Sequence, residues 1–132
     1  EDFIGAMVNV VPLRGIQPDI YVGWGNPSAF HYAYTYDSRD TSVNVTGIRI
    51  DNFGTLPAKN VKIYVALEST EEGKVWDQYT IASDDIPARG YNDGAYVTNL
   101  HAPTGESFRV SVVVHGDNFN PVESKGGWVT WH

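Results

Sequence analysis

Hydrophobic and polar residues alternate along much of this chain, a pattern typical of half-buried β-strands. Every second residue is apolar in two runs: Val61, Ile63, Val65 and Leu67 in the first, and Phe108, Val110, Val112 and Val114 in the second. Successive side chains of a strand point to opposite faces, so each run predicts a strand with one face toward the core. We expect these residues to form the centre of the hydrophobic core.

Helical periodicity is hard to find, whereas 13 Gly and 7 Pro separate short segments rich in Val, Ile, Tyr and Thr. The predicted strands are Ile4–Leu13, Ile20–Trp24, Phe30–Tyr36, Val43–Asn52, Asn60–Glu68, Val75–Ile81, Ala95–Leu100, Ser107–His115 and Gly127–Trp131. Many short strands with turn residues between them predict an all-β fold, an Ig-like antiparallel β-sandwich of about seven to nine strands. A length of 132 residues predicts a single domain over 1–132.

One predicted strand changes its phase part-way along. Val43 and Val45 fall on odd positions, but Ile48 and Ile50 fall on even ones. A β-bulge at Thr46-Gly47 would return all four side chains to the same face.

Turn residues are expected to connect the strands. The predicted connections are Pro12–Pro18, Gly25–Ser28, Asp51–Pro57, Ser83–Gly94 and Gly116–Gly127. In the third of these we expect the Asn52 side chain to bond to the backbone two residues on and Gly54 to adopt a positive φ. In the fourth, Asn92-Asp93-Gly94 has the composition of a tight turn.

Three stretches resemble a known family. Val45 to Val65 contains Asp51-Asn52-Phe53-Gly54 followed by Ala58-Lys59-Asn60-Val61, an Asn-x-Gly turn that leads into a strand. Ile86-Pro87-Ala88-Arg89-Gly90 resembles a mid-domain loop, and Asp117 to Glu123 follows a closing apolar strand. Together they resemble the cell-adhesion-related Ig-like domain of prokaryotes over residues 43–132, with 1–42 outside the resemblance.

The resemblance implies a sandwich on a bacterial or archaeal surface, with a structural or adhesive role and no catalytic residues. Length and architecture alone are also similar to those of the soluble domain of archaellum stator proteins. Both imply an extracellular or cell-surface protein that an N-terminal helix outside this chain could anchor. The family therefore favours a component of a filament, stator, adhesin or surface layer.

An aromatic stripe is the most unusual pattern in the sequence. Phe30, Tyr32, Tyr34 and Tyr36 share one face of a predicted strand, and Trp24 precedes them. On the surface, such rings would bind a protein partner or stack on sugar rings, whereas facing inward they would be core. Both possibilities stay open, and these five residues are the candidate binding residues.

Oxygen-rich loops are the second candidate. Asp117, Asn118 and Glu123 lie close together in sequence, and carboxylate and amide oxygens are ligands that calcium prefers. Their spacing does not match an EF-hand, and solvated turns of an acidic protein carry the same residues. These three residues are therefore weak calcium candidates. Our main expectation is that the protein needs neither a metal nor a cofactor.

Composition narrows the function further. The 16 Asp and Glu residues exceed the 9 Lys and Arg residues, giving a formal charge of -7 that disfavours nucleic acid and anionic membrane surfaces as partners. There is no cysteine, which excludes disulfides, thiolate metal sites and cysteine nucleophiles. The sequence also lacks the motifs Gly-x-Ser-x-Gly and His-Glu-x-x-His. We therefore expect no enzyme but a module that binds a protein partner or another copy of itself, with carbohydrate binding through Tyr and Trp rings as the alternative.

Overall fold

The computed structural model describes residues 17–24 and 41–130. The predicted strands Ile4–Leu13 and Phe30–Tyr36 lie outside the described residues. So do the four rings of the aromatic stripe, Phe30, Tyr32, Tyr34 and Tyr36.

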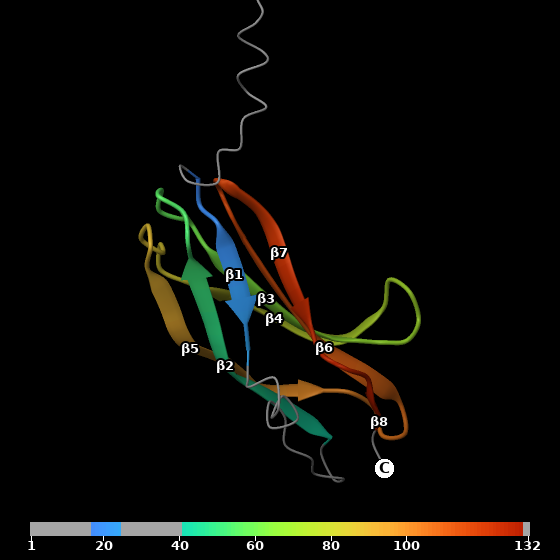
Figure 1. Cartoon of the computed structure of the whole chain (residues 1–132). Helices are drawn as coiled ribbons and strands as arrows, with labels where there is room; N and C mark the ends of the chain where they lie inside the picture. Colours follow the sequence, from blue (N-terminus) through green and yellow to red (C-terminus); the bar gives the residue numbers. More distant parts are fainter. Residues whose placement is uncertain (1–16, 25–40, 131–132) are drawn as a thin grey trace, which may run out of the picture.

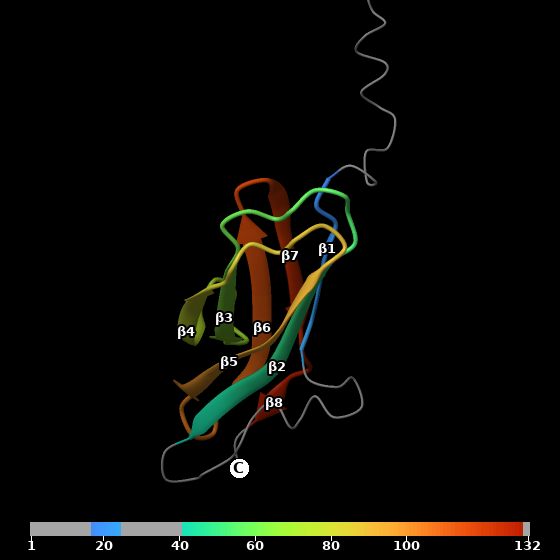
Figure 2. The ribbon, with the colours of Figure 1, turned by 90° about the vertical axis from the view of Figure 1, so that its left-hand side faces the viewer.

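The described residues form two antiparallel sheets that pack face to face (Figures 1 and 2). The strands are β1 (Ile20–Gly23), β2 (Ser42–Asn52), β3 (Lys62–Glu68), β4 (Val75–Ala82), β5 (Tyr91–His101), β6 (Ser107–Gly116), β7 (Phe119–Lys125) and β8 (Val129–Thr130). The smaller sheet has the order β1-β2-β5, and the larger has the order β4-β3-β6-β7, with β8 also paired to β6. The predicted all-β, Ig-like sandwich is confirmed. No helix in the described ranges is long and apolar enough to cross a membrane.

The core lies between the sheets, where the alternating residues predicted from the sequence meet. Val61, Ile63, Val65 and Leu67 are fully buried, as are Phe108 and Val112. In the register of β3 with β6, Val65 lies opposite Val112 and Ile63 opposite Val114, so both alternations point inward together. The predicted faces of these two strands are confirmed.

The predicted bulge in β2 is also confirmed. The register between β2 and β5 shifts between Val45 and Ile48, and Gly47 has a φ of 72°. Val45 and Ile48 are both fully buried despite their odd and even positions. One extra residue on β2 therefore keeps the apolar face of the strand on the core.

Two connections differ from the prediction. Gly116–Gly127 was expected to be a turn, but it contains β7, which pairs with β6 through Val114 and Val122. The sequence did not predict this strand because it contains three residues with low β-propensity, Asn120, Pro121 and Ser124. Pairing with β6 outweighs that low propensity. Asn92-Asp93-Gly94 lies inside β5 instead of forming a hairpin turn, with Gly94 at a φ of 87° where the register with β2 shifts.

The turn after β2 forms as expected, but for a different reason at its glycine. The backbone N–H of Gly54 donates to Asn52 Oδ1 at 3.0 Å, which is the predicted bond. Gly54 does not have a positive φ. Its missing side chain is required by packing instead, because a Cβ there would lie 1.6 Å from the carbonyl oxygen of Gln17.

Candidate functional site

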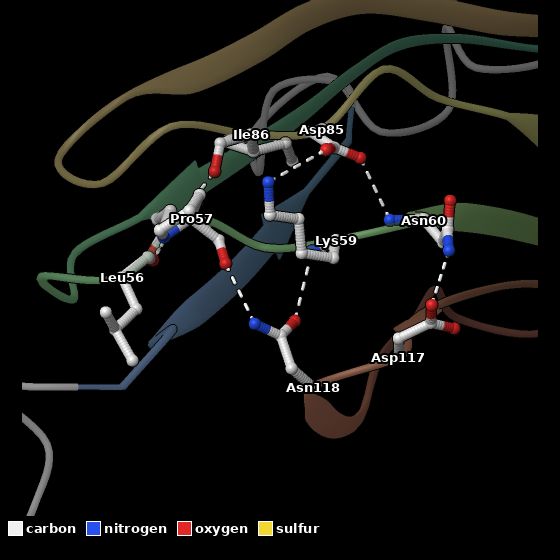
Figure 3. Close-up of polar contacts among 9 residues, drawn as sticks. Leu56, Pro57, Lys59, Asn60, Asp85, Ile86, Asp117 and Asn118 are labelled. Carbon is white, nitrogen blue, oxygen red and sulfur yellow. Dashed lines mark hydrogen bonds and ion pairs between the residues drawn. The ribbon is translucent and has the colours of Figure 1, made fainter.

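At one end of the sandwich, loops distant in sequence meet in a polar network that we call the loop latch: Pro57, Lys59, Asn60, Asp85, Asp117 and Asn118 (Figure 3). The Asn118 side chain accepts from the Lys59 backbone N–H at 3.0 Å and donates to the Pro57 carbonyl at 2.9 Å. The Asp117 backbone N–H donates to the Lys59 carbonyl at 2.9 Å. The turn between β6 and β7 is thus fastened to the segment that leads into β3.

Asp85 ties the connection between β4 and β5 to the same latch. Its carboxylate accepts from the Asn60 backbone N–H at 3.0 Å and lies 3.4 Å from the Lys59 ammonium (Figure 3). The hydrogen bond from Asn60 lowers the pKa of Asp85, partial desolvation opposes this, and Lys59 adds to the lowering. The Asn60 side chain donates to Asp117 on the other side.

The weak calcium candidates are divided by the fold. Asp117 and Asn118 belong to the loop latch, where their side chains hold Asn60, Lys59 and Pro57. Glu123 lies on β7, opposite Val113 of β6, and is exposed. Within the described ranges, no three His, Asp or Glu side chains gather as a metal-ligand set. The arrangement gives Asp117 and Asn118 a role in bracing loops.

A different surface gathers aromatic side chains, on the side of the smaller sheet away from the core. Directly opposed residues of neighbouring strands share a face, and Tyr21 pairs with Asp51, which pairs with Tyr91. Phe53 follows β2, and its ring centroid lies 6.5 Å from that of Tyr21. We call Tyr21, Arg49, Asp51, Phe53 and Tyr91 the outer aromatic face.

The rings of this face are large and open to solvent. Tyr21 is 58% exposed, Phe53 60% and Tyr91 59%. The Tyr21 ring lies over Gly23, since a Cβ on Gly23 would meet its Cε2 atom at 3.3 Å. A glycine at this position therefore lets the ring lie along the sheet.

Arg49 holds the polar part of the outer aromatic face in place. Its guanidinium carbon lies 4.1 Å from the centre of the Tyr91 ring. Its Nε and Nη2 atoms both donate to Asp51, at 3.2 and 3.1 Å, and Asp93 lies 3.7 Å away. The hydrogen bond with Asp51 raises the pKa of Arg49 in spite of partial desolvation. The guanidinium thus lies over the Tyr91 ring while it is paired with Asp51.

The larger sheet carries a charged cluster on its own outer side. Glu68 on β3 accepts from Arg109 Nε at 2.7 Å and lies 3.3 Å from the Lys125 ammonium. Burial raises the pKa of Glu68, but the hydrogen bonds and charges of Arg109 and Lys125 outweigh it and leave the pKa below its ordinary value. Trp128 stacks on Arg109 with 4.7 Å from the ring centre to the guanidinium carbon. These contacts tie β7 and Trp128, the residue before β8, to the centre of the sheet.

Among the aromatic binding candidates, only Trp24 falls in the described ranges. It is 8% exposed and belongs to the hydrophobic core. Its ring follows β1 and packs with Ile20 and Val22, so the structure gives it a packing role instead of a place on a binding surface.

Sequence reasoning passed over the outer aromatic face. Tyr21, Phe53 and Tyr91 come from three separate parts of the chain and only the strand pairing brings them together. A signal was present nonetheless. Tyr21 lies between two apolar residues, Ile20 and Val22, whose side chains point inward. Because side chains alternate along a strand, the Tyr21 ring must point outward.

Comparisons with known proteins support the fold. No family model matches the chain, and no curated protein matches it. A β-glucuronidase from glycoside hydrolase family 2 contains a similar structure, with a TM-score of 0.50 and 17% identity over 82% of this chain. A putative β-galactosidase from Bacteroides fragilis matches with a TM-score of 0.46 and 16% identity over 84% of this chain. The chain spans 11% and 16% of the length of these two proteins. The described part of this chain is thus an all-β sandwich, similar in fold to part of the β-glucuronidase.

Proposed function

We propose that this protein is a non-enzymatic module that binds a protein partner, or a second copy of itself, through the outer aromatic face. The observation that carries the proposal is the cluster of exposed rings, Tyr21, Phe53 and Tyr91, beside a guanidinium fixed by Asp51. Tyr and Arg are among the residues enriched in the few positions that dominate binding energy at protein interfaces. A rigid sheet that presents them loses little conformational entropy on binding.

We propose that this activity lies outside the cell, and the resemblance of the sequence to the cell-adhesion-related Ig-like domain supports this. The resemblance rests on the Asn-x-Gly turn and the loop segments, which the structure uses to join strands: Asn52 bonds to Gly54, and Ile86 pairs with Ala58. We propose a role in a filament, stator, adhesin or surface layer, with no cofactor and with neither nucleic acid nor lipid as the partner. The formal charge of -7 supports the last point.

Carbohydrate binding is the second candidate, and the same face favours it. Tyrosine rings that lie open on a sheet can stack on sugar rings, and Asp51 and Arg49 would supply hydrogen bonds to hydroxyls. The two candidates differ in the ligand and not in the residues used.

Site-specific photo-crosslinking tests the proposal. We would replace Phe53 by a photoreactive phenylalanine analogue, and Glu106 as a control, in cells that make the native protein. Glu106 is exposed in the connection between β5 and β6, away from the outer aromatic face. A discrete protein adduct from position 53 and none from 106 supports protein binding. If position 53 gives no adduct and the protein binds an oligosaccharide that Tyr91→Ala no longer binds, protein binding is wrong and carbohydrate binding takes its place.

A further inference from the structure

The sandwich is open along one side, where two strand edges lack a strand neighbour. In the described part of the chain β4 pairs only with β3, and β5 pairs only with β2. Figure 2 shows β4 and β5 on the same side of the molecule. The larger sheet is wider than the three-stranded sheet, so the inward face of β4 extends beyond the strands that cover the core.

Inward-facing residues of β4 show the consequence of this overhang. Tyr79 lies opposite Val65, and Ile81 opposite Ile63, so both point to the core side of the sheet. Val65 and Ile63 are fully buried, yet Tyr79 is 59% exposed. Tyr79 thus lies on the inner face of the larger sheet, but the smaller sheet does not cover it as it covers Val65 and Ile63.

Side chains close this open side at two points and leave it open between them. At one end the Asp77 carboxylate accepts from the His101 backbone N–H at 3.0 Å. At the other end the Asn92 side chain donates to Ser83 Oγ at 2.6 Å. Between these contacts lies a groove of about 540 Å³, the β4–β5 groove, lined by Tyr79, Ile81 and the β5 segment 94–98.

The lining of the groove matches an extended peptide. One wall is the free edge of a strand, which offers backbone donors and acceptors at strand spacing. The floor is an apolar inner face, Tyr79 and Ile81, two residues apart as alternate side chains of an added strand require. The segment 94–98 spans about 16 Å, the length of a strand of about five residues.

The position is also one where related sandwiches have a strand. In constant-type Ig domains the sheet that holds the first, second and fifth strands has a further strand beside the fifth. Here the corresponding sheet ends at β5, and the strand that follows β3 lies in the other sheet as β4. An added strand beside β5 would cover Tyr79 and extend the three-stranded sheet.

Charge indicates what should flank such a strand. Asp77 lies at one end of the groove, and the lining residues carry no charge. Asp93, which precedes the other end, is paired with Arg49 of the outer aromatic face. We infer that the β4–β5 groove binds an extended segment of a partner protein, apolar at alternate positions with a basic residue at the end beside Asp77, as an additional strand beside β5. This site is separate from the outer aromatic face.

Selection from a random twelve-residue peptide library displayed on phage tests the inference, with the whole chain as bait. We expect enriched peptides to have alternating apolar residues with Lys or Arg near one end. A synthetic peptide from the enriched set should shift backbone amide resonances in segments 79–81 and 94–98. Tyr79→Lys, which places a charge on the inner face, should weaken its binding at least tenfold.

The matched control is Thr80→Lys, which places the same charge on the same strand but on its opposite face. Thr80 is exposed and lies across from Tyr64, so this variant should bind the peptide as the wild type does. Thermal melts establish that both variants fold. Failure to enrich such peptides, equal binding by Tyr79→Lys, or shifts confined to other residues would overturn the inference. Binding of cellohexaose that Tyr79→Lys removes would overturn it in favour of a sugar site. None of these results bears on crosslinking at Phe53.

Discussion

A single amide side chain, that of Asn52, organises the end of the smaller sheet. It is 1% exposed. Its Oδ1 accepts from the backbone N–H groups of Asp19 and Gly54, and its Nδ2 donates to the carbonyls of Leu56 and Ile86. Buried polar groups cost free energy unless they are paired. Asn52 is a partner for the N–H groups of Asp19 and Gly54 and for the Leu56 carbonyl, and it adds a second hydrogen bond to the Ile86 carbonyl, which also accepts from the Ala58 N–H.

Replacing this residue tests its role. Asn52→Ala should lower the free energy of unfolding by about 2 to 4 kcal/mol, because several buried backbone groups lose their partners together. Asn120→Ala, at an exposed position of β7, should change it by less than about 0.5 kcal/mol. Urea denaturation of both variants measures the difference. Equal midpoints would mean that the hydrogen bonds of Asn52 are not needed.

Glu68 gives the molecule a defined response to acid. Its pKa is lowered in the folded protein, so its contribution to stability is present above the ordinary glutamate pKa of about 4.3 and is lost as the pH falls through the lower folded value. The side chain is 24% exposed, which keeps the effect modest. In thermal melts from pH 7 to pH 3, Glu68→Gln should lose less stability than the wild type. Parallel curves would contradict this role.

At the scale of elements, the sequence predicted every strand in the described ranges except β7, which lies at an edge of the larger sheet. β3 and β6 have one buried face and regular apolar spacing, and their inward residues were predicted correctly. β7 lies at an edge, where Val122 is only partly buried and Pro121 is tolerated. Edge strands need little hydrophobic patterning because one of their sides faces solvent, so β7 leaves a weak signal in the sequence.

The inward face of β3 can be tested within that strand. Val65 is fully buried, whereas Lys62 lies on the same strand and is partly exposed. Val65→Asp should unfold the domain by burying an unpaired charge, and Lys62→Asp should change the free energy of unfolding by under about 0.5 kcal/mol. Circular dichroism melts compare the two. Similar melting temperatures would be incompatible with the assigned faces.

At the scale of the whole molecule, the sandwich was predictable and the proposed binding surface was not. Strand periodicity is local and survives in the sequence, so the two-sheet architecture follows from it. A surface such as the outer aromatic face depends on the register between β1, β2 and β5, which joins Tyr21 to Asp51 and Asp51 to Tyr91. Register across strands distant in sequence is set by tertiary packing, and no short motif records it.

The two proposed sites also divide the molecule between them. The outer aromatic face lies on the side of the smaller sheet away from the core, and the β4–β5 groove lies along the open side of the sandwich. They share no lining residue, so a substitution in one removes no lining side chain from the other. This arrangement would let a surface module hold one partner on its face while a strand of another protein pairs with its edge.

The affinity of the protein captured at Phe53 for purified variants of this chain tests the central claim most directly. Tyr91→Ala should weaken binding at least tenfold, about 1.4 kcal/mol, because it removes an exposed ring and the support of Arg49. Glu106→Ala should bind as the wild type does, and both should melt within a few degrees of it because both positions are exposed. Unchanged affinity for Tyr91→Ala would contradict the assignment of the outer aromatic face as the binding surface.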